Sequence, residues 1–147
     1  MTITGLDSFD STVQKSHIWL NEIMQEGGWE DKHRAYIILR SVLHALRDRL
    51  RVDEAVNLGA QLPMLLRGMY YDGWDPARAP LKVRSKDEFL MLIKSGYQSA
   101  QLDVEPGEAF KIVINILLKN ISQGEMQEVK HSMPAQIQQL WPETTVH

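Results

Sequence analysis

The sequence of 147 residues contains no cysteine. This absence excludes a disulfide-stabilised scaffold, zinc or iron–sulfur centres held by cysteine, and catalysis by a thiol nucleophile. The chain has nine glycines and six prolines, and aromatic residues make up 7% of it. The formal net charge is only −3, so neither sign dominates, and the chain as a whole does not have the charge of a general polyanion binder.

Long hydrophobic runs are also absent. The run Ile112-Val113-Ile114 is broken by Asn115, and no apolar run approaches the roughly eighteen residues that span a bilayer. The first twenty residues contain two aspartates and one lysine, without the basic start and apolar stretch of a signal peptide. We therefore expect a cytoplasmic protein with no membrane partner.

Apolar residues recur at helical spacing along the chain, and no alternating pattern of five or more residues predicts a strand. With 44% hydrophobic and 24% charged residues, the composition is that of a globular protein. We therefore predict an all-α fold of about eight helices. They span residues 7–26, 31–51, 53–62, 63–71, 85–97, 106–121, 122–129 and 134–141.

Local signals mark several of the expected helix ends. Gly27-Gly28 ends the first helix, because glycine tolerates the left-handed conformation that closes a helix. The prolines at 63, 106 and 134 each suit the start of a helix, where the missing N–H costs nothing. Ser85 and Ser122 are each followed three residues later by glutamate, which is the spacing of a capping box.

The two halves of the chain are similar in pattern. A shift of 71 positions places residues 38–70 on residues 109–141, so that Pro63 meets Pro134 and Glu54 meets Glu125. Only four of the 33 aligned positions are identical, but one ungapped register matches a long helix, a short helix and a helix that follows a proline. This predicts an internal duplication in which each unit covers the apolar face of the other.

The predicted organisation is therefore two similar four-helix units in one compact body. The first unit covers residues 1–74 and the second covers residues 85–147. Residues 75–84 read as a linker, because two prolines within this segment disfavour helix.

Three stretches carry a resemblance to a known family: Val42 to Leu50 with the sequence VLHALRDRL, Asp53-Glu54-Ala55, and Gln61 to Gly68 with the sequence QLPMLLRG. Together with Met133-Pro134 in the second half, they resemble the bacterial family catalogued as domain of unknown function 2267, over about residues 9–142. The second half departs from that pattern at Met133 and in the polar run from Gln136 to Gln139. The resemblance implies an all-helical, internally duplicated bacterial protein, and it implies no activity.

Motifs for catalysis or metal binding are missing. Ser41, Ser95 and Ser132 lie in predicted helices without a Gly-x-Ser-x-Gly setting, and no glycine-rich phosphate loop is present. His44 and Asp48 share one helix face, yet no His-Glu-x-x-His or paired Glu-x-x-His motif accompanies them. We expect no enzymatic activity, no catalytic residues, no metal site and no cofactor.

Basic residues are concentrated around the linker. Arg78, Lys82, Arg84 and Lys86 supply four positive charges, with no acidic residue between positions 76 and 86. Such a group can contact phosphate, so these four residues are weak candidates for an anion site. A solvated linker is the preferred interpretation, and we do not expect a nucleic-acid partner.

Aromatic residues gather where the first unit ends. Tyr70, Tyr71 and Trp74 lie beside Asp72-Gly73, and Tyr70 has the phase of a core residue. Tyr71, Trp74 and Trp19, which lies off the apolar stripe of its helix, are weak candidates for contacts with a protein partner or a second copy.

The leading functional hypothesis from the sequence is a non-enzymatic binding or assembly module. The alternative is a small-molecule or metal site between the two helical units. A flat apolar patch would favour the first, whereas a deep polar pocket that contains a strongly perturbed pair of titrating groups would favour the second.

Overall fold

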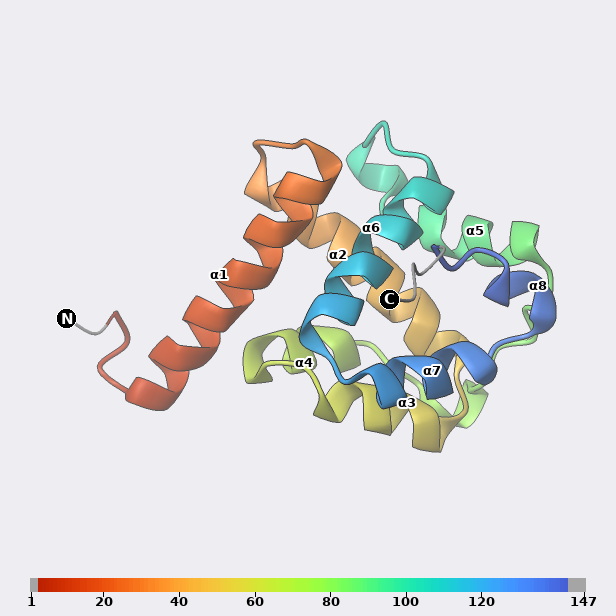
Figure 1. The fold of residues 1–147 in the computed structure, drawn as a ribbon, viewed down its shortest axis with the longest axis horizontal. Coiled ribbons are helices and arrows are strands. Elements are labelled where there is room, and N and C mark those ends of the chain that lie inside the picture. Colours follow the sequence, from red (N-terminus) through yellow and green to blue (C-terminus); the bar gives the residue numbers. More distant parts are fainter. Residues whose placement is uncertain (1–2, 143–147) are drawn as a thin grey trace.

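The structure, a computed structural model, describes residues 3–142. Within this range the chain forms eight α-helices and two short 3₁₀ helices, and no strand (Figure 1). The all-α prediction is therefore confirmed. The α-helices are α1 (Asp7–Gly27), α2 (Lys32–Arg49), α3 (Val52–Ala60), α4 (Met64–Tyr71), α5 (Lys86–Ser95), α6 (Pro106–Asn120), α7 (Gln123–His131) and α8 (Ala135–Gln138).

The helix ends follow the local signals in the sequence. Gly28 closes α1 with a φ of 69°, a conformation that glycine adopts without strain. Asp31 begins α2 by accepting a hydrogen bond from the backbone N–H of His33 at 3.0 Å. Ser85 and Glu88 form both hydrogen bonds of the predicted capping box at the start of α5.

The two helices with the most buried residues, α2 and α6, form the centre of the molecule. α2 packs against α1, α4, α5 and α6, and α6 also contacts α1, α5 and α7. Leu39, Leu43 and Leu46 of α2 and Val113 and Leu117 of α6 have no exposed surface. Burying each such side chain contributes about 1.5–3 kcal/mol, so this helix pair supplies a large part of the stability.

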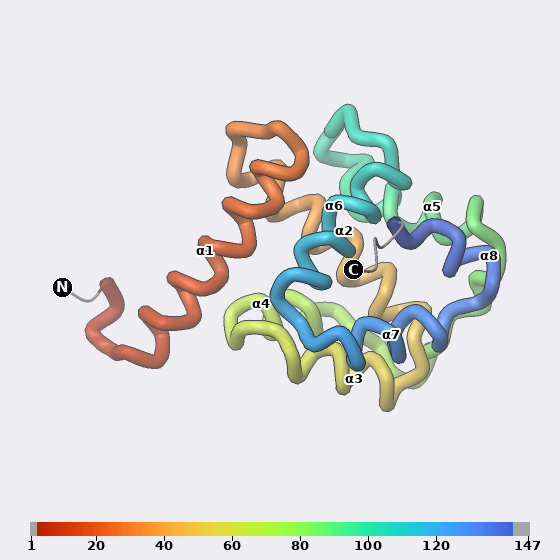
Figure 2. Tube along the Cα trace, viewed as in Figure 1, coloured from red at the N-terminus to blue at the C-terminus, as the bar shows by residue number. Residues whose placement is uncertain are grey.

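The chain segments of the two predicted units are interlocked. α1 packs on both α2 and α6, and α5 packs on both α6 and α2, so each segment covers a helix of the other (Figure 2). The segment 75–84 between them contains a 3₁₀ turn at Pro76–Arg78 and is tied to α2. Leu81 donates its N–H to the carbonyl of Asp48 at 2.8 Å, and Arg49 donates to the carbonyl of Val83 at 2.6 Å.

The residues that α1 buries differ from those predicted from the sequence. Trp19, which was expected off the buried face, is only 5% exposed, because both α2 and α6 pack against this helix and widen its buried face. Phe9 was expected on the buried face but is 50% exposed. It lies in the first part of α1, which extends away from the central helices (Figure 1).

Several element bounds coincide under the shift of 71 positions. α3 (Val52–Ala60) corresponds residue for residue to α7 (Gln123–His131), and α4 and α8 each begin directly after a proline, Pro63 and Pro134. α8 ends at Gln138, however, so it is shorter than predicted. Among the described residues, no helix has both the length and the apolar character needed to cross a membrane.

Candidate functional site

The candidate site lies where α3 and α7 pack against each other. Glu54 and Glu125 are each the third residue of their helix, and they are the two positions that the 71-residue shift superposes. Ser122 accepts a hydrogen bond from the N–H of Glu125 at 3.3 Å. The return bond that completes the box at Ser85 is not formed here, so the Glu125 carboxyl group is free to turn towards α3.

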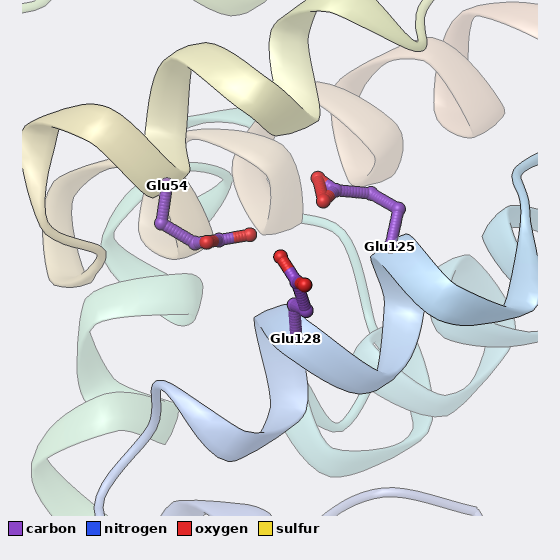
Figure 3. A group of neighbouring side chains, drawn as sticks. All are labelled: Glu54, Glu125 and Glu128. Atoms are coloured by element: carbon purple, nitrogen blue, oxygen red, sulfur yellow. The ribbon is translucent and has the colours of Figure 1, made fainter.

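Three carboxyl groups meet at this contact. Glu54 on α3 and Glu125 and Glu128 on α7 point towards one another (Figure 3), and each offers an oxygen that lies within 4.8 Å of the other two. Glu54 is only 5% exposed, Glu125 is half-buried and Glu128 is exposed. We call these three residues the glutamate cluster.

The cluster is electrostatically unfavourable when it is fully ionised. Burial, followed by the charge of Glu54, raises the pKa of Glu125 to about 7. Burial and the charge of Glu128 also raise the pKa of Glu54. A proton held by Glu54 or Glu125 relieves the repulsion between these two carboxyl groups.

The surroundings neutralise these charges only in part, because the charge of Arg51 lowers the pKa of Glu54 less than burial and the charge of Glu128 raise it. None of the three carboxylates takes part in an ion pair within residues 3–142. Arg51, at the start of α3, instead lies 3.7 Å from Asp53. Glu54 Oε1 and Glu125 Oε2 are buried, and neither accepts a hydrogen bond from any N–H or hydroxyl group in the described part of the chain.

A polar hollow opens beside the cluster. Its volume is about 600 Å³, and it is lined by Arg51, Glu54, Glu128, His131 and Ser132. Carboxylate oxygens that converge on such a hollow can share a proton, hold a hard metal ion, or accept hydrogen bonds from an organic cation. All three uses place positive charge among the carboxylates.

A larger hollow of about 830 Å³ lies between α1 and the start of α4. Its wall includes Ser8, Ser11 and Lys15, which are exposed on α1, and Met64, which is half exposed. This surface contains no converging group of buried titrating side chains comparable to the glutamate cluster. The cluster is therefore the stronger candidate for chemistry.

The predicted aromatic candidates are only partly brought together. Tyr71 and Trp74 stack with ring centroids 5.5 Å apart and are half-buried against the core. Tyr70 is fully buried, as predicted, and its hydroxyl donates to the carbonyl of Ala55 at 2.7 Å. Trp19 is buried in α1, so it is not available for the contact surface predicted with the other two residues.

The polar residues of α2 hold the end of α4. His44 Nε2 lies 2.8 Å from the carbonyl of Met69, and Arg47 donates to the carbonyls of Tyr70 and Asp72 at 2.9 Å. These contacts satisfy carbonyls that the end of a helix leaves without partners. Asp48 pairs with Arg47 at 2.8 Å, so this part of the sequence has a structural role.

The basic candidates lie along the linker and at the start of α5. Arg78, Lys82, Arg84 and Lys86 are all exposed, in agreement with a solvated segment. Arg84 is close enough to Arg49 for its charge to contribute, after burial, to lowering the pKa of that guanidinium. A role for these residues in binding an anion stays a prediction.

The glutamate cluster was not predicted as a site from the sequence. Its signal was present, because Glu54 and Glu125 are the only acidic pair among the four identities between the halves. A glutamate at the third position of a helix is usually explained by capping and by the helix dipole. Only the packing of α3 on α7 brings the two carboxyl groups together.

We compared the chain with known protein families. The pattern of one family, described as an uncharacterized conserved protein (DUF2267), matches residues 16–140. The chain belongs to the DUF2267 family. The match includes α2 to α8 and all three residues of the glutamate cluster, so the candidate site lies within the part of the chain shared with DUF2267. No curated protein matches the chain.

Proposed function

We propose that this DUF2267 protein is a non-enzymatic binding module of the bacterial cytoplasm that takes a cationic ligand in the glutamate cluster. The observation that carries the proposal is Glu54, which is 5% exposed, has a carboxylate oxygen without a donor, and faces two further carboxyl groups. A buried carboxylate without a partner is costly, and a bound cation would remove that cost.

The proposal includes an internal duplication, with the site on the contact between the two units. The coincident bounds of α3 and α7 and the matching prolines before α4 and α8 support it. The packing also supports it, because α1 contacts α6 and α5 contacts α2, and these two contacts are interchanged when the units are exchanged. Glu54 and Glu125 would then be equivalent residues facing each other across the contact.

The absence of a catalytic role is part of the same proposal. The hydroxyl groups of Ser41, Ser95 and Ser132 donate to carbonyls of their own helices at 2.6–2.8 Å. Such bonds engage each hydroxyl with its own helix, whereas a serine nucleophile donates its proton to a general base within reach. This arrangement favours binding over nucleophilic catalysis.

A protein-contact function is the second candidate. Phe9 and Ile18 on α1 and Met64 and Leu65 on α4 are each about half exposed, and exposed apolar side chains can meet a partner or a second copy. We rank this function second. A polar hollow beside a pair of carboxyl groups with raised pKa values favours a ligand site over a protein contact, and both features are found at the glutamate cluster.

A thermal unfolding assay on the full chain tests the proposal. Ca²⁺ and the organic dication 1,4-diaminobutane are compared with sulfate at matched ionic strength. A ligand that binds only the folded protein raises the midpoint of unfolding as its concentration exceeds the dissociation constant. We expect at least one cation, and not sulfate, to raise the midpoint. If neither cation raises it at millimolar concentration, the proposed function is wrong.

A further inference from the structure

We propose that Glu54, Glu125 and Glu128 bind one hard divalent cation, such as Ca²⁺, through oxygen ligands alone. This inference rests on the proposed function and names the ligand class. Carboxylate oxygens without sulfur are the ligands that Ca²⁺, Mg²⁺ and Mn²⁺ prefer. The adjacent hollow leaves room for the water molecules that complete the coordination of such an ion.

The spacing of the oxygens suits an ion of this size. Calcium–oxygen bonds are about 2.3–2.6 Å long, so two oxygens on opposite sides of one ion lie at most about 4.6–5.2 Å apart. The three carboxylates offer oxygens within 4.8 Å of one another. Three oxygens spread evenly around one such ion lie about 4.0–4.5 Å apart, so small rotations of the side chains are enough to bring all three carboxylates onto one ion.

Two further observations separate this cluster from an ordinary group of surface acids. Glu54 is more than nine-tenths buried, points into the cluster, and has an oxygen that accepts no hydrogen bond from an N–H or hydroxyl group of residues 3–142. Glu125 does not make the capping bond to Ser122 that its position allows, whereas Glu88 makes the equivalent bond to Ser85. The carboxyl group of Glu125 is directed towards Glu54 and Glu128 instead.

The charge balance also favours a divalent ion. The cluster contributes up to three negative charges, and the adjacent Arg51, which lies 3.7 Å from Asp53, offsets only part of them, since its charge lowers the pKa of Glu54 less than burial and the charge of Glu128 raise it. One divalent cation neutralises most of that charge at a single point. A monovalent amine would leave a larger part of the repulsion between Glu54 and Glu125.

The direct test is titration calorimetry of the full chain at pH 8, after treatment with EDTA and dialysis, with CaCl₂, MgCl₂ and MnCl₂ as the probes. We expect at least one ion to bind with one site per chain. Glu54→Gln and Glu128→Gln are expected to weaken that binding by about tenfold or more. The control Glu26→Gln, an exposed glutamate on α1, is expected to bind like the wild type.

The stability of the metal-free variants tests whether the cluster is costly to the fold when no ion is bound. Glu54→Gln removes one buried charge and can donate an amide hydrogen bond to Glu125, so we expect the metal-free variant to unfold at higher urea concentration than the wild type. Glu128 is exposed, so Glu128→Gln keeps the test valid if the other variant folds poorly.

Each outcome is decisive. If none of the three ions binds to the wild type, the metal assignment is wrong, and binding of 1,4-diaminobutane would then preserve the broader proposed function. If an ion binds equally well to wild type, Glu54→Gln and Glu128→Gln, the site is elsewhere and the assignment is overturned. Loss of binding in both variants, with full binding in Glu26→Gln, supports it.

Discussion

Single polar residues in this protein divide into those with a partner and those without one. His44 and Arg47 bond to the last carbonyls of α4, and Arg47 also pairs with Asp48. Glu54 and Glu125 face each other instead and have oxygens without a donor in the described chain. The hydrogen bonds of His44 and Arg47 stabilise the fold. Glu54 and Glu125, in contrast, mark the place where the fold keeps an unfavourable charge.

The protonation of His44 is expected to make the fold sensitive to acid. Burial lowers the pKa of His44 below 6.5, so the unfolded chain takes up this proton more readily than the folded protein. The contribution of His44 to stability is therefore complete above pH 6.5 and is lost as the pH falls below it. We expect urea unfolding to show a larger loss of stability between pH 7.5 and pH 5.5 in the wild type than in His44→Gln.

Comparing these two proteins isolates His44, because the glutamate cluster titrates in both. An equal loss of stability in the wild type and the variant would contradict the prediction.

At the scale of the helices, most ends depend on one or two local residues, whereas the contacts between helices depend on residues distant in the chain. α5 comes close to α2 at Gly96, where an added Cβ would lie 2.6 Å from the hydroxyl oxygen of Ser41 and 3.1 Å from its Cα. The backbone of Gly96 itself is ordinary helix, with a φ of −73°. This glycine is therefore required by the approach of the two helices and not by its own conformation.

Gly96→Ala is expected to destabilise the protein by about 1–3 kcal/mol, because the new methyl group forces α5 away from α2. Gly68→Ala is the matched control. Gly68 lies within α4, and an added Cβ there meets no atom within 4 Å. The control is expected to increase stability by about 0.5–1 kcal/mol, the usual gain of alanine over glycine in a helix. Urea unfolding measures both changes, and equal effects would contradict the close approach.

At the scale of the whole molecule, the two segments joined by residues 75–84 share one core. α1 is covered by α6 as well as α2, and α5 is covered by α2 as well as α6. Neither segment can lose its helices without exposing apolar surface of the other. This arrangement differs from two separate domains on a flexible linker, since the linker itself is hydrogen-bonded to α2.

We therefore expect the chain to unfold in one cooperative transition. Far-ultraviolet circular dichroism reports all helices, while tryptophan fluorescence reports the surroundings of Trp19, Trp29, Trp74 and Trp141. The two signals are expected to give the same midpoint in urea. Two transitions, or midpoints that differ between the signals, would show that the segments unfold independently.

Much of the helix content could be predicted from the sequence, but the candidate site could not. Gly28, Ser85 and Pro106 mark helix ends through the backbone groups of their own neighbours, so their effect is visible in a few residues of sequence. Trp19 and Phe9 were misplaced, because their burial depends on which other helices reach α1.

The sequence by itself determined an all-helical chain with most of its helix bounds, because helical periodicity and capping act over a few neighbouring residues. The tertiary structure decided which helix covers which and brought Glu54 and Glu125 into contact from separate halves of the chain. The physical reason is that the energy of two carboxyl groups depends on their distance and burial. Neither quantity exists until α3 packs on α7.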